Sequence, residues 1–592
     1  MDRTQIAENY KWKVTDIFPS DEAWEAEFSA LEQDYPAEKF TAYQGKLSDK
    51  ASLLALYALN DEFSRRAEKL YLYAHMKNDE DLRVSKYNSM TARTMSFFTK
   101  ISSATAFIDP ELTALDETTL NAFIKDKDFA AYDYQLQRIA ASKAHVLSEN
   151  EEKLLALASD VMGGFRSVFS MMNNANLNLP KAPLNGEEVQ MSHGLYGLVL
   201  HSTNRLDRER WFKDYYKAFI NLIDSITQTY YGNVKKNVFY KTARNYESCL
   251  QMALDGEDVS SEVYNNLIES VHVALPTMHR YISVRKQILG YDEQHMYDIY
   301  APLVEDAEIK LPFDEAYDLV VKGLAPLGEE YQNLLRKGKD EGWIDVCEND
   351  GKRSGAYSTG VYDTHPFVLL NYQQTMNDMF TVAHEMGHSL HTYMSNANQP
   401  YAKANYKIFV AEIASTVNEV LLLKYLYGST EDKNLKKYLL SYYMDTIRAT
   451  LFRQTQFAEF EQLAHAKVEK DEPLTKESLC ELYYELNKQY YGDGIVHDQE
   501  IAYEWARIPH FYTAFYVYKY ATGIISAISI VKRILTEGEP AVKDYFEFLK
   551  SGGSTDPVSI LKKAGVDLTT KAPFETAMQE FSDTLSEFER LL

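Results

Sequence analysis

The feature that most constrains the fold is the spacing of apolar residues along most of the chain. From about residue 20 to 165, 205 to 290 and 313 to 337, apolar side chains recur three or four positions apart, as in LLALYALNDEFSRRAEKLYLYAHM at 53–76. That period matches the turn of an α-helix and puts the apolar side chains on one face. Helical patterns return after residue 372 and continue to about 550. The sequence therefore predicts a mainly α protein.

Two stretches interrupt the helical pattern. Glycines and turn residues separate short β-branched or apolar runs in residues 340–372, which include GWIDVCENDGKRSGAYSTGVYDTHPFVLLNY, and this favours one small β-sheet. Prolines, glycines and asparagines gather in NLNLPKAPLNGEEVQMSHG at 176–194, where we expect a boundary. A chain of 592 residues is long enough for two domains. We expect them at 1–190 and 191–592.

Composition narrows the classes of function and the compartment. A net charge of −25 argues against nucleic-acid binding, which needs clustered basic residues, and gives no support to a membrane partner. Three widely spaced cysteines and an N-terminus without a basic region and apolar core favour the cytoplasm. The longest apolar run near the C-terminus, GIISAISIV at 523–531, is about half a bilayer span. We expect a monomer or a small homo-oligomer.

The stretch TVAHEMGHSLHTYM at 381–394 carries the clearest chemistry. His384 and His388 lie one helical turn apart, so both imidazoles can reach one zinc ion at about 2.0–2.1 Å. Glu385 projects beside them and can take a proton from a water whose pKa zinc has lowered to about 7. This is the HExxH arrangement of zinc peptidases. The alternative is an ordinary amphipathic helix with a solvated polar face.

The third zinc ligand is not expected from the same helix. His391 lies seven residues beyond His384, about 10 Å along the axis at 1.5 Å per residue, whereas tetrahedral ligand atoms lie only about 3.4 Å apart. We interpret His391 as a core histidine or a neighbour of the ligands. In IFVAEIASTVNEVLLLKYLYG at 408–428, Glu412 is the better candidate. Glu419 either orients a ligating histidine or belongs to a solvated acidic face.

These residues resemble the M3 family of zinc oligopeptidases, and in particular its oligoendopeptidase F branch. The similarity rests on HEMGHSLH, FVAEIASTVNE, GKRSGAYSTG and HPFVLLNY, and extends to IPHFYTAFYVYKYATG at 508–523 and SGGSTDPVSILKKAGVDL at 551–568. The resemblance implies a two-lobed helical metallopeptidase with a deep substrate channel, whose one small β-sheet lies next to the zinc-binding helix. It implies that residues 1–190 form one channel wall and residues 191–592 the catalytic domain.

The resemblance also implies roles for individual residues. His384, His388 and Glu412 match the ligands of one zinc ion, and Glu385 matches the catalytic base. PFVLLNY at 366–372 matches a sheet-edge strand that pairs with an extended peptide, although an ordinary buried strand would have the same pattern. His510, Tyr512 and Tyr516 fall where the family places groups that contact the substrate carbonyl. Core packing is the alternative for each of these aromatic residues.

The resulting prediction is a zinc-dependent metalloendopeptidase that hydrolyses internal bonds of short unfolded peptides, with zinc-bound water attacking the carbonyl and Glu385 as general base. A zinc carboxypeptidase or dipeptidyl carboxypeptidase would use the same metal site. A helical peptide-binding protein with structural zinc is an alternative of another class. Structural zinc sites have four protein ligands, often cysteines, and no cysteine lies near HEMGH.

Overall fold

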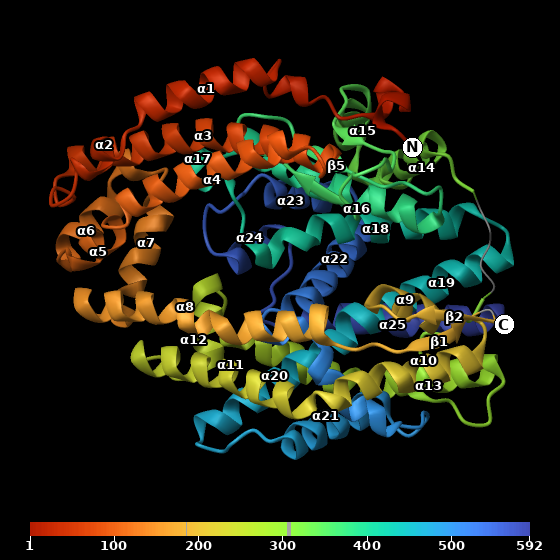
Figure 1. Cartoon of the computed structure of the whole chain (residues 1–592). Helices are drawn as coiled ribbons and strands as arrows, with labels where there is room; N and C mark the ends of the chain where they lie inside the picture. Colours follow the sequence, from red (N-terminus) through yellow and green to blue (C-terminus); the bar gives the residue numbers. More distant parts are fainter. Residues whose placement is uncertain (185, 305–309) are drawn as a thin grey trace. The chain divides into compact units, whose positions relative to one another are not determined.

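The computed structural model is built almost entirely of α-helices (Figure 1). It describes residues 1–184, 186–304 and 310–592. This confirms the predicted mainly α class. The helical periods in the sequence correspond to real helices, among them α3 (Lys50–Glu80), α13 (Ser261–Leu289) and α15 (Glu329–Asp340).

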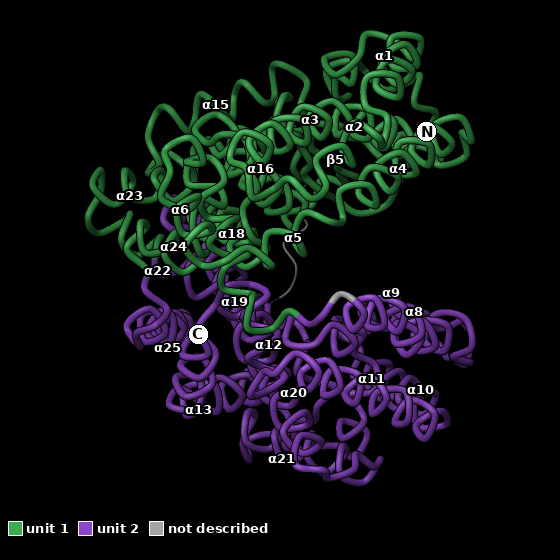
Figure 2. Tube along the Cα trace, turned by 90° about the vertical axis from the view of Figure 1, so that its left-hand side faces the viewer, with its two compact units in different colours: residues 1–146, 308–425, 530–566 green, residues 147–307, 426–529, 567–592 purple. Residues whose placement is uncertain are grey.

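The described residues divide into two compact units, each assembled from three separate stretches of chain (Figure 2). Unit 1 comprises residues 1–146, 308–425 and 530–566, and unit 2 comprises residues 147–307, 426–529 and 567–592. The expected domain division at residue 190 follows chain order, does not coincide with these units and stays a prediction. Helices α18 (Ile408–Ser429) and α22 (Tyr518–Glu537) run across unit boundaries.

The remaining helices belong to one unit or the other. In unit 1 they are α1 (Asp21–Asp34), α2 (Ala37–Thr41), α4 (Ser85–Thr105), α5 (Ile108–Ala114), α6 (Glu117–Lys125), α7 (Asp133–Ser142), α14 (Phe313–Gly323), α16 (Met376–Asn398), α17 (Tyr401–Ala404), α23 (Glu539–Leu549) and α24 (Pro557–Lys563). In unit 2 they are α8 (Glu149–Met171), α9 (His193–Leu200), α10 (Arg205–Asn221), α11 (Ile223–Ala243), α12 (Cys249–Glu257), α19 (Lys433–Ile447), α20 (Arg453–Glu469), α21 (Lys476–Tyr491) and α25 (Ala572–Leu591).

The sheet predicted before the histidine helix is present in unit 1. It consists of β3 (Ile344–Asp345), β4 (Tyr357–Thr359) and β5 (Phe367–Leu369), in the order β3-β5-β4. β5 is parallel to β3 and antiparallel to β4. The prediction that PFVLLNY supplies an edge strand was therefore wrong: β5 is the central strand, and all three of its residues are buried.

A second small sheet lies in unit 2, where only a boundary was expected. Strands β1 (Lys181–Leu184) and β2 (Glu187–Gln190) form an antiparallel pair. The signal for a hairpin was the Asn-Gly pair at 185–186, which is strongly preferred in two-residue turns. Residue 185 lies outside the described residues, and Gly186 has a φ of +85°.

The sheet of unit 1 is covered on one face by the N-terminal helices. Phe367 and Leu369 belong to the same apolar core as Trp24, Phe28 and other buried side chains of α1, α3 and α4. Because side chains alternate along a strand, Val368 faces the other way. Helix α16 contacts both β4 and β5. The sheet thus connects the N-terminal helices to the helix that carries the HEMGH sequence.

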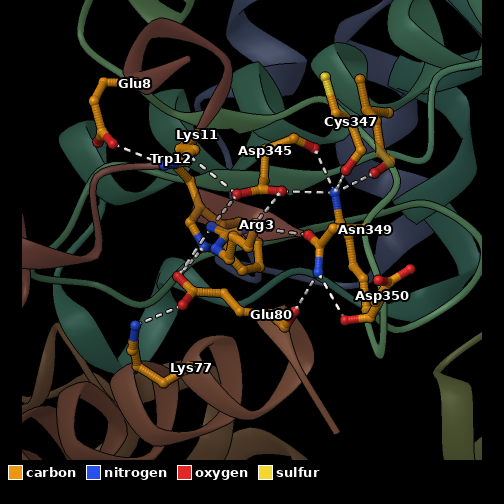
Figure 3. Close-up of polar contacts among 12 residues, drawn as sticks. Arg3, Glu8, Lys11, Trp12, Lys77, Glu80, Asp345, Cys347, Asn349 and Asp350 are labelled. Carbon is orange, nitrogen blue, oxygen red and sulfur yellow. Dashed lines mark hydrogen bonds and ion pairs between the residues drawn. The ribbon is translucent and has the colours of Figure 1, made fainter. Parts of the chain in front are cut away.

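A cluster of buried charges fastens the first residues of the chain to this sheet (Figure 3). The Arg3 guanidinium donates to Asp345 Oδ2 at 2.5 Å and lies 3.2 Å from Glu80 Oε1. The Lys352 ammonium, fully buried, donates to Asp345 Oδ1 at 2.6 Å and to the carbonyls of Cys347 and Leu370 at 2.6 Å each. Burial alone would raise the pKa of Asp345, but Arg3 and Lys352 hold it below its usual range.

Among the residues that the structure describes, one helical stretch, Asn150–Asn176, is long and apolar enough to cross a bilayer by length and composition alone. One such helix is weak evidence for a membrane span.

Replacing Asp345 with Asn should destabilise unit 1 strongly. The substitution leaves the buried Lys352 ammonium without its charged partner, and breaking a buried ion pair from one side costs about 3–5 kcal/mol. The control is Asp350→Asn, whose side chain is 64% exposed, and which should change stability by less than about 0.5 kcal/mol. Chemical denaturation of both variants measures the difference. Equal stabilities would contradict the role given to Asp345.

Candidate functional site

The HEMGH sequence lies in the middle of helix α16, well inside its ends. Thr375 caps the helix: its hydroxyl accepts from the Asp378 backbone N–H, and the Asp378 carboxylate accepts from the Thr375 backbone N–H. One face of α16 is an apolar stripe that is buried throughout: Met379, Ala383, Met386, Leu390 and Met394. The buried stripe and the cap fix the rotation of α16, and so the direction in which His384 and His388 project.

Gly387 lets α18 approach α16 closely. A Cβ atom at Gly387 would lie 2.5 Å from the Cα atom of Ser415 and 2.7 Å from the Ala414 carbonyl oxygen. Only a glycine fits between these backbones, since real Cβ contacts are never that short. The fully buried Asn418 reinforces the contact by donating to the Ala383 carbonyl at 3.0 Å. The glycine inside HEMGH thus brings Glu412 within reach of the histidines.

Three donor atoms from these two helices converge on one point. His384 Nε2 and His388 Nε2 are 3.2 Å apart, and Glu412 Oε2 lies 3.4 Å from the first and 3.5 Å from the second. Ligand atoms around tetrahedral zinc are separated by about 3.4 Å, given metal–ligand distances near 2.1 Å. Among the described residues, this is the group of histidine, cysteine and acidic side chains whose spacing suits a metal ion.

The charges around this group favour a cation. His384 Nδ1 donates to Glu419 Oε1 at 2.5 Å, which leaves Nε2 for the metal. Burial lowers the pKa of His384, but hydrogen bonds to Glu412 and Glu419 outweigh it and raise the pKa to about 10. Hydrogen bonds from both histidines lower the pKa of Glu412. The surrounding carboxylates thus stabilise positive charge at the point where the donor atoms meet.

Glu385 occupies a different environment from the donor group. Its side chain is only 7% exposed, and this burial raises the pKa of its carboxyl group. The backbone N–H of Ser358, on strand β4, faces the Glu385 carboxylate and partly offsets this rise in pKa. The Ser358 hydroxyl also lies 2.8 Å from the hydroxyl of the buried Ser389, one turn along α16. The link to Ser358 is invisible in the sequence, since 27 residues separate the two positions.

His391 belongs to the core of unit 1. Its ring stacks on Tyr406 with centroids 3.8 Å apart, and Phe548 lies 5.2 Å away. Burial lowers the pKa of His391 to about 3, so the ring is neutral. His391 is not part of the group of converging donor atoms, in keeping with the helix-rise argument.

The three C-terminal aromatic candidates lie in unit 2 and differ in exposure. His510 is exposed, and its Nε2 lies 3.3 Å from the Tyr520 hydroxyl. The rings of His510 and Tyr516 are nearly parallel, with centroids 6.0 Å apart. Tyr512 is buried and stacks on Phe169 at 4.3 Å. His510, Tyr516 and Tyr520 therefore form one partly exposed cluster, whereas Tyr512 points into the unit 2 core.

A buried acid supports the loop that carries this cluster. Phe515 has a φ of +56°, which is costly for a bulky side chain, and its backbone N–H donates to Glu461 Oε1 at 3.0 Å. Glu461 is fully buried in α20, and burial raises its pKa to about 8. A protonated carboxylic acid therefore holds the loop at neutral pH. Sequence reasoning missed Glu461 because nothing nearby in the sequence marks it.

Comparison with known proteins decides the family. The family model described as Peptidase family M3 matches residues 198–580, and a model described as Oligopeptidase F matches residues 111–178. The chain belongs to the oligoendopeptidase F branch of peptidase family M3. It is therefore a metallopeptidase.

Named relatives of this M3 peptidase align along its whole length. Oligopeptidase PepF of Bacillus subtilis (strain 168) is 45% identical, covering 100% of this chain and 88% of the relative. Group B oligopeptidase PepB of Streptococcus agalactiae serotype III (strain NEM316) is 40% identical, covering 100% of this chain and 98% of the relative.

Solved structures agree with the fold. A putative peptidase from Chlamydophila abortus matches with a TM-score of 0.94 at 36% identity, over 100% of both chains. Oligoendopeptidase-F from Enterococcus faecium matches with a TM-score of 0.75 at 34% identity, over 96% of this chain and 99% of that one.

Gly387→Ala should separate α18 from α16 and disrupt the donor group. Overpacking at a close backbone contact costs about 1–3 kcal/mol, and a misplacement of about 1 Å at a catalytic site can cost about a hundredfold in rate. The control is Gly163→Ala, also in a helix, where a Cβ meets nothing within 4 Å. Thermal unfolding, bound metal and peptide hydrolysis are the measurements. A variant with normal metal content and activity would show that the glycine is dispensable.

Glu461→Gln should flatten the dependence of stability on pH. The carboxyl group ionises near 4.5 when unfolded and near 8 when folded. Between these values the folded protein binds more protons, so its unfolding free energy falls as pH rises, by about 1.4 kcal/mol per pH unit at most. Gln does not ionise, so the variant does not lose stability in this way. The difference in unfolding free energy between the variant and wild type should shift most in favour of the variant near pH 8. Denaturant titrations between pH 5 and 8, with the exposed Glu481→Gln as control, test this; parallel curves for wild type and Glu461→Gln would refute it.

Proposed function

We propose that this M3 peptidase is a zinc-dependent metalloendopeptidase that hydrolyses internal bonds of short, unfolded peptides. The observation that carries the proposal is the convergence of His384 Nε2, His388 Nε2 and Glu412 Oε2, with mutual distances of 3.2–3.5 Å, beside a buried carboxylate. Three protein ligands leave a fourth position open, which is the arrangement of catalytic rather than structural zinc sites.

The donor set fits zinc better than calcium or magnesium. Two imidazoles and one carboxylate suit zinc, whereas hard cations prefer an all-oxygen shell. Glu419 would hold the tautomer of His384 that presents Nε2, because it accepts the Nδ1 proton. When bound, the ion would polarise the scissile carbonyl and lower the pKa of a water molecule.

Glu385 would move the protons of the reaction. Its burial raises its affinity for a proton, which brings the carboxyl group closer to the neutral pH at which a general base works best. Glu385 would accept a proton from the attacking water and pass it to the departing nitrogen. The Ser358 N–H, which faces this carboxylate, would favour one orientation of the side chain.

The strand that would bind an extended peptide is β4 rather than β5. β4 is at the edge of the sheet, and main-chain pairing along an edge recognises peptides with little regard to their sequence. His510 and Tyr516 are the candidates to donate to the developing oxyanion, since both reach the surface of unit 2. For Tyr512, its burial against Phe169 favours a packing role.

The size of the substrate is inferred from the relatives. Both full-length relatives described above are named oligopeptidases, and the Enterococcus faecium structure is named an oligoendopeptidase. We infer the same preference for short peptides and for internal bonds here.

Glu385→Gln should abolish turnover while zinc remains bound. Gln has nearly the same shape but cannot accept the proton, and loss of a general base costs about 10²–10⁴-fold. The zinc content of the purified variant, determined by elemental analysis, should equal that of wild type. Retained hydrolysis would reject Glu385 as the base, and loss of zinc would point to a structural rather than a chemical defect.

A peptide blocked at both ends distinguishes the proposed activity from its alternatives. Mass spectrometry should find internal cleavage by wild type that a chelator abolishes and added zinc restores. A carboxypeptidase or dipeptidyl carboxypeptidase would leave the capped peptide intact. Binding without cleavage, unaffected by the chelator, would favour a peptide-binding protein.

A further inference from the structure

Strand β4 leaves one of its edges free, and hydrogen bonding in the sheet determines which groups lie on it. The β5 residues Val368 and Leu370 donate their backbone N–H groups to the carbonyls of Trp343 and Asp345, both at 2.8 Å. Because N–H directions alternate along a strand, Phe367 and Leu369 face β4 and pair with Thr359 and Tyr357. Ser358 lies between these pairs, so its N–H and C=O lie on the free edge, which is consistent with the N–H facing the Glu385 carboxylate.

The side chains of β4 anchor the strand on both faces. Ser358 points towards α16, where its hydroxyl lies 2.8 Å from that of Ser389. Tyr357 points to the opposite face, towards the N-terminal helices, and packs against the core formed by α1, α3 and α4. β4 is only three residues long and pairs with a single strand, so the sheet itself holds it weakly.

On that opposite face, Tyr357 binds one buried acid. Its hydroxyl donates to Asp79 Oδ2 at 2.7 Å, and Asp79 is fully buried in the last turns of α3. The same carboxylate lies 3.3 Å from His75 Nε2. The Asp79 backbone carbonyl accepts from the Arg353 N–H at 3.0 Å, just before the strand. Asp79 thus holds both the strand and the segment that leads into it.

We propose that Asp79 and Tyr357 are positioning residues for catalysis, which hold strand β4 against α16 so that the Ser358 N–H faces the Glu385 carboxylate. This inference rests on the proposed role of Glu385 as the base. The path runs from α3 through Tyr357 to the strand, and from Ser358 to Glu385. Neither Asp79 nor Tyr357 touches the donor group, so their loss should leave zinc binding intact.

The first test is Tyr357→Phe, which removes the hydroxyl and keeps the ring in the core. We expect kcat for a blocked peptide to fall at least about tenfold, because a misplaced base is inefficient, with KM changed less than about threefold and zinc content unchanged. The matched control is Tyr73→Phe on α3, the helix that also carries Asp79. The Tyr73 hydroxyl donates to Asp21 at 2.7 Å, so the control removes an equivalent tyrosine–aspartate bond away from β4. It should leave kcat as in wild type.

Two further variants separate positioning from general stability. Asp79→Asn can still accept from Tyr357 through its amide oxygen, and should keep kcat within about threefold of wild type. The double variant Asp79→Asn/Tyr357→Phe removes the buried carboxylate together with the hydroxyl that donates to it. It should therefore fold even if Tyr357→Phe, which leaves the carboxylate without that donor, does not. We expect it to show the same loss of kcat. Wild-type kcat in the double variant would overturn the inference.

Failure of this inference is distinguishable from failure of the proposed function. If Glu385→Gln is inactive and Tyr357→Phe and the double variant turn over like wild type, only the positioning role is wrong. If Tyr73→Phe lowers kcat as much as Tyr357→Phe does, the loss reflects stability and the inference also fails. If Glu385→Gln remains active, the proposed function itself is wrong.

Discussion

The candidate site depends on the contact between α16 and α18 at Gly387. The two ligand candidates on α16 cannot complete a metal site by themselves. The third must come from a second helix that lies close to α16 at the level of the two histidines. A side chain at position 387 would collide with the Ser415 Cα atom, and the hydrogen bond from Asn418 to Ala383 holds the helices in register. The absence of a side chain at Gly387 therefore allows Glu412 to lie beside His384 and His388.

The small sheet links that helix pair to the rest of unit 1. One face of the sheet packs into the N-terminal apolar core through Phe367 and Leu369, while the Ser358 side chain reaches α16. The charged cluster of Arg3, Asp345 and Lys352 fastens the first residues of the chain to the same sheet. Buried ion pairs add little net stability but are specific in geometry. They fix where the sheet lies between its two helical layers.

Much of this arrangement could be predicted because its signals are local. Helical periodicity indicated the class, and HEMGH places two histidines and an acid within five residues. Helix rise then excluded His391, and Glu412 is the candidate acid on the next long helical pattern. These inferences use spacing within single helices, which simple geometry fixes.

The features that could not be predicted depend on pairing between distant segments. That β5 is central follows from its parallel pairing with β3, more than 20 residues earlier; no pattern within PFVLLNY distinguishes a central from an edge strand. Tyr512 and Tyr516 are four residues apart in an aromatic-rich loop, and the positive φ of Phe515 disrupts any regular alternation of faces. Asp79 and Glu461 lie on ordinary helices. Their contacts with β4 and with the Phe515 loop arise only from tertiary packing, so no local pattern marks them.

The charged cluster also has a consequence for protein synthesis. Arg3 and Asp345 are 342 residues apart, so at about 5–20 residues per second the ribosome needs on the order of tens of seconds to deliver the partner. During that interval the early helices lack both the electrostatic anchor and the Phe367 and Leu369 side chains that complete their core. Unit 1, whose last segment begins at residue 530, can therefore reach its native packing only near the end of translation, and its nascent helices depend on protection from aggregation until then.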